Sequence, residues 1–149
     1  MSMKLHEIET RAVDSPSPYA QKHAAQYLES GGKAVEHGMA DQLILLYVKG
    51  RKSGEIRRVP LVHFRDGDDM LVVASKGGAP ANPDWYDNLV ADPKIWVRFM
   101  DDFFEARASV LTDAERTPAW ERITREAPAF GDYQAKVSRT IPLVKLTRV

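Results

Sequence analysis

The chain has 149 residues, the length of one ordinary domain, and its 44% hydrophobic and 28% charged residues exclude collagen-like and disordered proteins. Lysine plus arginine number 21 and aspartate plus glutamate number 21, so no overall charge draws the protein to nucleic acid or to an anionic membrane. The absence of cysteine excludes disulfides, thiolate metal sites and a cysteine nucleophile.

The N-terminal part of the chain contains a Ser-Pro-Ser-Pro stretch that ends at Pro18. Because such a stretch disfavours regular structure, we expect residues 1–18 to form a loose arm and residues 19–149 to form a single domain. Small and apolar residues recur at helical spacing over residues 19–28, which predicts a short amphipathic helix. No apolar run has the length of a signal peptide or a membrane span, so we expect a cytoplasmic protein, with peripheral association at the inner membrane face left open.

Most of the remaining chain has the composition of β-strands, with β-branched and aromatic residues between short turns. The expected strands cover residues 43–48, 56–64, 70–75, 95–100, 103–111 and 141–146. Successive strands joined by short turns pair as antiparallel hairpins. Six such strands with inserted helices favour an α+β fold, mainly β, and a small β-barrel, because closing the sheet removes its exposed edges.

Helix-start signals occur at two places between these strands. Asn82 has the character of an N-cap residue, with Pro83 at the first helical position. Thr112 and Glu115 have the spacing of a capping box, and Pro118 offers a competing helix start. We therefore expect one short helix after residue 82 and another after residue 112.

A cluster of positive charge lies at the first hairpin turn. Five basic residues and one acidic residue give residues 49–58 a net charge of +4 (five minus one) within a chain of net charge zero. Gly50 and Gly54 let the turn expose its backbone N–H groups, and converging Arg and Lys side chains suit a phosphate or a carboxylate. A solvated hairpin tip explains the charge equally well. No phosphate-binding P-loop or Rossmann fingerprint is present, so neither of those nucleotide sites is predicted.

A second glycine-containing segment, residues 75–78, follows a predicted strand and precedes a predicted helix. Its backbone amides can approach a flat ligand or an anion, and Lys76 adds charge, although a plain connecting loop explains the glycines too. In the helix that follows, core packing of Trp85 is favoured over a stacking platform. The four histidines are scattered without the spacing of a zinc site, so we predict no metal.

Taken in order, these segments closely resemble the deazaflavin-dependent nitroreductase family from about residue 43 to residue 146. The motifs that carry the resemblance are Gly50-Arg51-Lys52-Ser53-Gly54, Arg57, Pro60, Ala74-Ser75-Lys76-Gly77-Gly78-Ala79, Asn82-Pro83-x-Trp85-Tyr86-x-Asn88-Leu89, Asp132-Tyr133-Gln134 and Arg139-Thr140-Ile141-Pro142. The resemblance implies a split β-barrel, similar to FMN-binding barrels. It also implies an oxidoreductase that binds the 8-hydroxy-5-deazaflavin coenzyme F-420 and uses its reduced form.

The resemblance also implies roles for individual residues. The anionic tail of the coenzyme falls to Lys52 and Arg57, with Arg51 and Ser53 beside them, and the deazaflavin ring and its linker fall to Pro60, Ser75, Lys76, Gly77 and Gly78. Trp85, Phe130 and Tyr133 correspond to the substrate pocket. Ser75 or Tyr133 is the candidate for orienting the acceptor or relaying a proton.

The acceptor is less closely defined than the coenzyme. Family members that reduce bulky nitroimidazoles carry several tyrosines where this chain has Ala127, Phe130 and Tyr133, so we expect a quinone-like or other conjugated acceptor in preference to a nitro compound. FMN is the weaker candidate coenzyme, because it lacks a long anionic tail to lie along Lys49, Arg51 and Arg58. A non-catalytic carrier of deazaflavin or lipid is a further alternative. The only partner expected is the small acceptor, without nucleic acid, with a homodimer left open.

Overall fold

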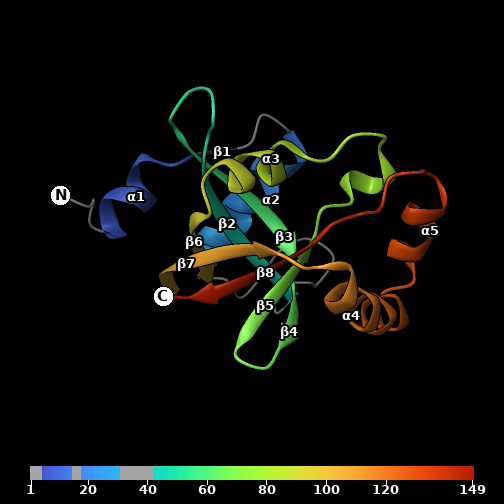
Figure 1. Cartoon of the computed structure of the whole chain (residues 1–149). Coiled ribbons are helices and arrows are strands. Elements are labelled where there is room, and N and C mark those ends of the chain that lie inside the picture. Colours follow the sequence, from blue (N-terminus) through green and yellow to red (C-terminus); the bar gives the residue numbers. More distant parts are fainter. Residues whose placement is uncertain (1–4, 15–17, 31–41) are drawn as a thin grey trace.

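The computed structural model describes residues 5–14, 18–30 and 42–149 (Figure 1). The helices are α1 (Leu5–Arg11), α2 (Pro18–Glu29), the 3-10 turn η3 (Lys76–Gly78), α3 (Asp84–Ala91), α4 (Asp113–Glu126) and α5 (Ala129–Ala135). The strands are β1 (Val13–Asp14), β2 (Leu43–Lys49), β3 (Ile56–Val62), β4 (Phe64–Asp66), β5 (Asp69–Val73), β6 (Lys94–Phe99), β7 (Asp102–Val110) and β8 (Leu143–Arg148). The predicted α+β class is confirmed, but its description as mainly β is not, because helices cover about as many of the described residues as strands do.

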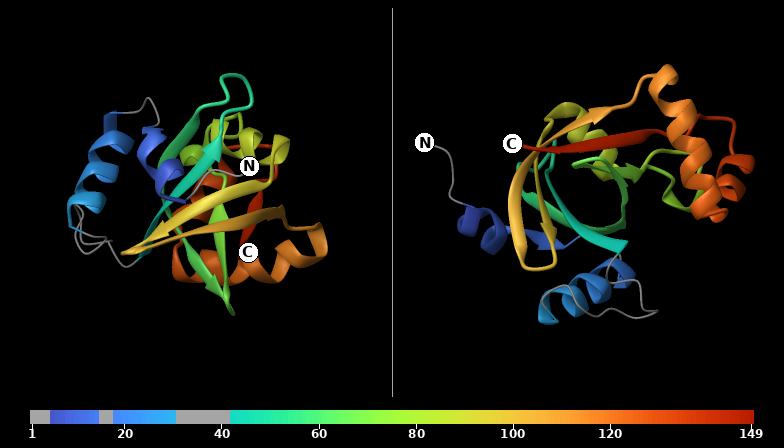
Figure 2. Two further views of the ribbon diagram at one scale, coloured as in Figure 1. Left: turned by 90° about the vertical axis from the view of Figure 1, so that its left-hand side faces the viewer. Right: turned by 90° about the horizontal axis from the view of Figure 1, so that it is seen from below.

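In the described residues the strands form one sheet in the order β1-β3-β2-β6-β7-β8-β5-β4, with eight strands where six were expected. The expected strand over residues 56–64 is divided at His63 into β3 and β4, and β1, with two residues, is too short to leave a sequence pattern. The expected closure is also wrong, because no described ladder joins the end strands β1 and β4. The sheet is open but strongly curled, so that β3 and β5 approach each other (Figure 2).

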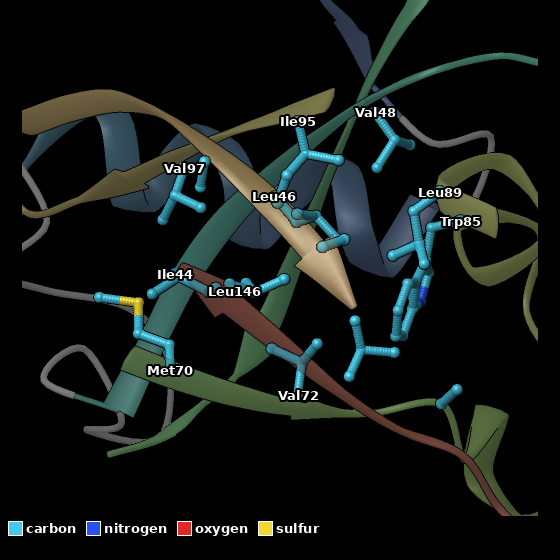
Figure 3. Close-up of a cluster of buried hydrophobic side chains, with 14 of the residues drawn as sticks. Ile44, Leu46, Val48, Met70, Val72, Trp85, Leu89, Ile95, Val97 and Leu146 are labelled. Carbon is cyan, nitrogen blue, oxygen red and sulfur yellow. The ribbon is translucent and has the colours of Figure 1, made fainter. Parts of the chain in front are cut away.

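The concave side of the curled sheet encloses the largest apolar cluster (Figure 3). Side chains from β2, β6 and β8 meet there, and Trp85 and Leu89 of α3 point in among them. Burying this face anchors α3 across one end of the sheet, beside the turn between β2 and β3. Helices α4 and α5 lie at the end opposite to α1.

Part of the segment expected as a loose arm has regular structure and packs on the sheet. Ile8 of α1 is 2% exposed, and β1 pairs in parallel with β3. Two partly buried ion pairs hold this segment to the sheet, between Glu9 Oε2 and Arg98 Nη1 at 3.0 Å and between Asp14 Oδ1 and Arg58 Nε at 2.6 Å. On the same face of the sheet, burial raises the pKa of Tyr47 to about 12. The local pattern around the proline-rich stretch could not reveal these long-range contacts.

The two predicted helix starts have different outcomes. The capping box at Thr112 is confirmed, because its hydroxyl accepts from the amide of Glu115 while Thr112 donates back to the Glu115 carboxylate. Pro118 therefore lies inside α4 and does not begin it. At α3 the N-cap is Pro83 and not Asn82. Asn82 instead accepts a hydrogen bond from Arg139, which is far away in the sequence.

Two further properties of the described chain bear on its function. Among residues 5–14, 18–30 and 42–149, no helix is both long and apolar enough to cross a membrane. Over the same described residues, no group of three or more metal-ligating side chains is close enough together to hold an ion.

Candidate functional site

A cavity of about 840 Å³ opens where the β2–β3 turn, η3 and α3 come together. Its wall is formed by Val48, Gly50, Arg51, Lys52, Ser53, Arg57, Val59, Pro60, Leu61, Val73, Ser75, Lys76, Gly77, Pro83, Asp84, Trp85 and Asn88. The two segments that the sequence singled out, residues 50–54 and 75–78, thus contribute to one site although about 20 residues separate them. A cavity of this size suits a ligand with the bulk of a cofactor.

The pairing of β2 with β3 decides which basic residues face the cavity. Arg57 is opposite Val48, and both line the cavity, whereas the next pair, Tyr47 and Arg58, points to the other face. Arg58 is bound to Asp14 on that other face. The expectation that Arg58 and Lys49 follow an anionic tail is therefore not supported, since neither residue is in the wall of the cavity. Side-chain alternation along a strand is the physical reason.

Arg51 lines the cavity, but its guanidinium is held by α3. Both its backbone amide and its Nη1 donate to Asn88 Oδ1, at 3.1 and 2.8 Å. Its Nη2 lies 4.0 Å from a carboxylate oxygen of Asp84 and 3.9 Å from one of Asp87, both of them loose ion-pair contacts. Arg51 thus ties the basic turn to α3. Lys52, Arg57 and Lys76 add further positive charge to the wall, and Arg57 has a similarly loose contact of 3.8 Å with Glu55.

The segment around η3, which lines the cavity, has an unusual backbone conformation. Ser75 has right-handed helical dihedrals, whereas Lys76 and Gly77 have φ of 49° and 63°. This right-then-left sequence is the geometry of a nest, in which successive N–H groups converge on an anion or a polarised oxygen. Among the described residues, the amides of Ser75, Lys76 and Gly77 find no protein acceptor, whereas those of Gly78 and Ala79 bond within the turn. The nest therefore has three donors available for a ligand.

Part of the cavity wall is apolar. Its apolar residues are Val59, Pro60 and Leu61 of β3 together with Val73 and Trp85. Trp85 is 8% exposed and belongs to the main core, so it has both of the roles that the sequence left open, core packing and lining the site. The cavity wall thus combines cationic side chains with apolar ones.

Three residues expected at the site lie outside this cavity wall: Gly78, Phe130 and Tyr133. Phe130 packs edge-to-face against Phe64 at 5.9 Å and against Tyr133 at 5.8 Å, over a separate apolar cluster that includes Ile123. The structure thus gives both aromatic residues a packing role. Gly78 faces α5, where an added Cβ atom would lie 3.1 Å from the carbonyl oxygen of Tyr133.

Gly78 and Gly77 form a matched pair for a test of this contact. Gly78 has φ of +82° and is crowded by α5, whereas Gly77 has φ of +63° and open space around the added Cβ. Left-handed strain costs alanine about 1 kcal/mol at either position, and crowding adds about 1–2 kcal/mol at Gly78 only. We expect Gly78→Ala to lower the free energy of unfolding in urea by clearly more than Gly77→Ala. Equal losses would contradict close packing of α5 on η3.

Two residues of the site were not assigned a role from the sequence, although both belong to motifs that carried the resemblance. Asn88 is 7% exposed and anchors the basic turn through Arg51. Its signal was a polar residue on the apolar side of a helix. Arg139 donates hydrogen bonds to backbone carbonyl groups of the segment after β5. No local pattern could show its partners, because they lie about 60 residues earlier in the chain.

Comparison with known proteins gives a consistent result. The family model described as F420H(2)-dependent quinone reductase matches residues 19–148. An F420H(2)-dependent quinone reductase of Mycobacterium tuberculosis (strain ATCC 25618 / H37Rv) is 35% identical over 131 residues, which cover 85% of this chain and 87% of that protein.

Solved structures agree with the sequence comparisons. The structure titled "Structure of F420-H2 Dependent Reductase (FDR-A)" is 34% identical, with a TM-score of 0.65, and covers 70% of this chain and 93% of its own. A second structure, whose title reads "domain-swapped dimer", is 32% identical with a TM-score of 0.68 and covers 89% and 99% of the two chains. The predicted oxidoreductase that uses reduced F-420 as its coenzyme is thereby confirmed. The chain belongs to the F420H(2)-dependent quinone reductase family.

Proposed function

We propose that this protein binds reduced F-420 in the 840 Å³ cavity and directs its hydride to a quinone-like acceptor. The observation that carries the proposal is the combination of cationic and apolar residues in one cavity wall. Lys52, Arg57 and Lys76 supply positive charge, and Val59, Leu61 and Trp85 are among the residues that supply apolar surface. A coenzyme with an anionic tail and a planar ring requires both surfaces within one cavity.

The tail of the coenzyme is assigned to the basic turn. Lys52 and Arg57 provide charge-assisted hydrogen bonds to its anionic groups, and Ser53 lines the same part of the wall. Arg51 acts indirectly, because its guanidinium is already hydrogen-bonded to Asn88 and lies near two carboxylates of α3. Its part is to hold the turn beside α3, so that Lys52 and Arg57 face the cavity.

The ring is assigned to the space between the nest and the apolar wall. The amides of Ser75, Lys76 and Gly77 are available to polarise ring oxygens, and Pro60 and Trp85 supply surface for the ring faces. When bound, the reduced deazaflavin supplies a hydride as a two-electron donor. The protein then has to hold donor and acceptor in a reactive alignment and limit the access of water.

The hydroxyl of Ser75 is the candidate for orienting the acceptor or passing it a proton, because Ser75 is 7% exposed and lines the cavity. Tyr133 and Phe130 remain predictions as acceptor residues. Their position on α5, which packs against η3, brings them near the site but not into its described wall. The quinone preference therefore rests on the apolar wall and on the family, and not on these two residues.

Several broader features belong to the same proposal. The open, curled sheet is consistent with a split β-barrel. We assign residues 19–149 to a single domain. The related structure titled as a domain-swapped dimer supports a homodimer. A cytoplasmic location is proposed from the cysteine-free composition.

The proposed coenzyme can be tested with purified protein. We expect fluorescence titration to show tight binding of oxidised F-420 and much weaker binding of FMN, because one phosphate cannot engage all three cationic side chains.

The proposed acceptor is tested by turnover. In anaerobic absorbance assays, a small quinone should oxidise the reduced coenzyme faster than a bicyclic nitroimidazole at equal concentration. A flat apolar acceptor leaves fewer polar groups unpaired against β3 and Trp85, each of which costs about 1–3 kcal/mol.

Each of the other outcomes would indicate a different function for this protein. Equal affinity for FMN and F-420 would favour a flavin enzyme. Tight binding of F-420 without oxidation by any acceptor would favour a carrier. Fast nitroimidazole reduction with quinones ignored would contradict the acceptor assignment while leaving the coenzyme site in place.

A further inference from the structure

Arg139, in the connection between α5 and β8, makes an unusual set of contacts. Its guanidinium donates to the carbonyl oxygens of Ala74 at 3.3 Å, Ser75 at 2.9 Å and Ala79 at 3.1 Å. It also donates to the side-chain oxygen of Asn82 at 2.6 Å. Within the described part of the chain, no carboxylate lies within ion-pair distance of Arg139. Its donors are therefore directed at a single short backbone segment, residues 74–82.

That segment contains the nest. Ser75, Lys76 and Gly77 line the cavity wall, whereas Arg139 does not. The carbonyl groups of Ala74 and Ser75 are held by Arg139, while the amides of Ser75, Lys76 and Gly77 find no protein acceptor in the described residues. Because Arg139 engages carbonyls and none of these amides, it supports the peptide orientation that the nest requires.

The conformation of this segment needs such support. Lys76 has φ of 49°, a left-handed conformation that is unfavourable for a residue with a Cβ atom. Only two hydrogen bonds close the turn from within, from Gly78 to Ser75 at 3.0 Å and from Ala79 to Lys76 at 3.1 Å. A strained conformation persists when its surroundings hold it, and Arg139 supplies bonds on both sides of Lys76.

Arg139 is itself held in place. Gln134 of α5 donates from Nε2 to the backbone carbonyl of Arg139 at 2.7 Å. The Oε1 atom of Gln134 accepts from the Ile141 amide at 2.9 Å and from Arg116 at 3.3 Å. The backbone at Arg139 and Ile141 is thus fixed to Gln134 of α5 and through it to Arg116 of α4, which gives the guanidinium a defined position.

We infer that Arg139 is a positioning residue that builds the amide nest of the coenzyme site without contacting the coenzyme. The inference rests on the proposed function, because it concerns the same cavity. Arginine is suited to this role since its planar group offers five donors in fixed directions, whereas lysine offers a single ammonium. Loss of Arg139 should weaken coenzyme binding by loosening residues 75–79 and not by removing a contact.

The first test uses the protein without coenzyme. Amide hydrogen exchange at Gly78 and Ala79, followed by NMR, reports whether the turn is closed. We expect at least about tenfold faster exchange in Arg139→Gln than in the original protein, and an intermediate rate in Arg139→Lys, because lysine keeps only part of the bonding. Asn82→Asp keeps the acceptor for Arg139 and should exchange at the original rate within about twofold.

The second test measures binding and turnover in the same variants. Fluorescence titration with oxidised F-420 should give a dissociation constant raised about tenfold or more in Arg139→Gln. The KM for the reduced coenzyme should rise by a larger factor than kcat falls. The matched control is Arg122→Gln, which also removes a guanidinium bound to a backbone carbonyl, that of Arg65, far from the cavity. It should change neither exchange at Gly78 nor coenzyme affinity.

The outcomes separate this inference from the proposed function. Unchanged exchange and a dissociation constant within about twofold in Arg139→Gln would overturn the role of Arg139. If Arg139→Gln does not fold, amide exchange at Gly78 and Ala79 in Arg139→Lys and Asn82→Asp decides the same question. Faster exchange in Arg139→Lys than in Asn82→Asp supports the role of Arg139, and equal rates overturn it. If the original protein does not bind F-420, the proposed coenzyme site fails, while the exchange rates still show whether Arg139 holds the turn.

Discussion

Replacing both Lys52 and Arg57 by alanine is expected to remove tight coenzyme binding. Each side chain is partly exposed in the cavity wall and, under the proposed function, donates charge-assisted hydrogen bonds to an anionic tail. Such bonds contribute about 1.5–3 kcal/mol each, so each single variant should weaken binding by about 10- to 150-fold. The double variant should lose about the sum of the binding free energies that the two single variants lose. Binding by the original protein should also weaken as salt concentration rises, because partly exposed charges are screened.

The measurement is a fluorescence titration with oxidised F-420, with a matched control in the adjacent residue. Arg58 follows Arg57 in β3, but it points to the opposite face and binds Asp14. Arg58→Gln should therefore lower the free energy of unfolding and leave the dissociation constant unchanged. If Arg57→Ala and Arg58→Gln weaken coenzyme binding equally, side-chain alternation along β3 does not decide which cationic side chains contact the coenzyme.

Replacing Trp85 by alanine is expected to cause the largest loss of stability among the residues of the site. Trp85 is 8% exposed and packs with Leu89 into the main cluster (Figure 3). Truncation of a buried tryptophan typically costs about 3–5 kcal/mol, since it loses burial and leaves a cavity. Trp85→Phe keeps most of the apolar volume and should cost less than about half as much.

Urea unfolding measures this loss, and Val90 on the same helix provides the control. Val90 is 57% exposed, so Val90→Ala should change the free energy of unfolding by less than about 0.5 kcal/mol. Coenzyme titration of Trp85→Phe then isolates the contribution of the indole surface to the ligand site. A Trp85→Ala protein as stable as the original would show that the residue is a surface platform and not part of the core.

Much of this architecture could be predicted from the sequence, because its causes are local. Runs of β-branched and aromatic residues between short turns placed the central strands. The capping box at Thr112 and Glu115 began α4 where expected, since hydrogen bonds within one helical turn decide the start of a helix. The motif series also indicated the family and placed Lys52, Arg57, Pro60 and Ser75 at the site, and all four line the cavity.

Other features depend on contacts between distant segments. Asn82 had the character of an N-cap residue, but Arg139 engages its side chain. Residues 49–58 have a net charge of +4, yet the pleat of β3 sends Arg58 to the opposite face and Asn88 of α3 holds the guanidinium of Arg51. Phe130 and Tyr133 matched pocket aromatics, but α5 places them in a separate apolar cluster.

The sequence by itself determined the composition of the site, namely a basic glycine turn and a second glycine turn followed by an aromatic helix. Only the tertiary structure decided which side chains meet in the cavity and which carbonyl groups beside the cavity are bound by Arg139. The physical reason is that strand register and side-chain direction are set by packing across the whole sheet, whereas motifs record only neighbours along the chain.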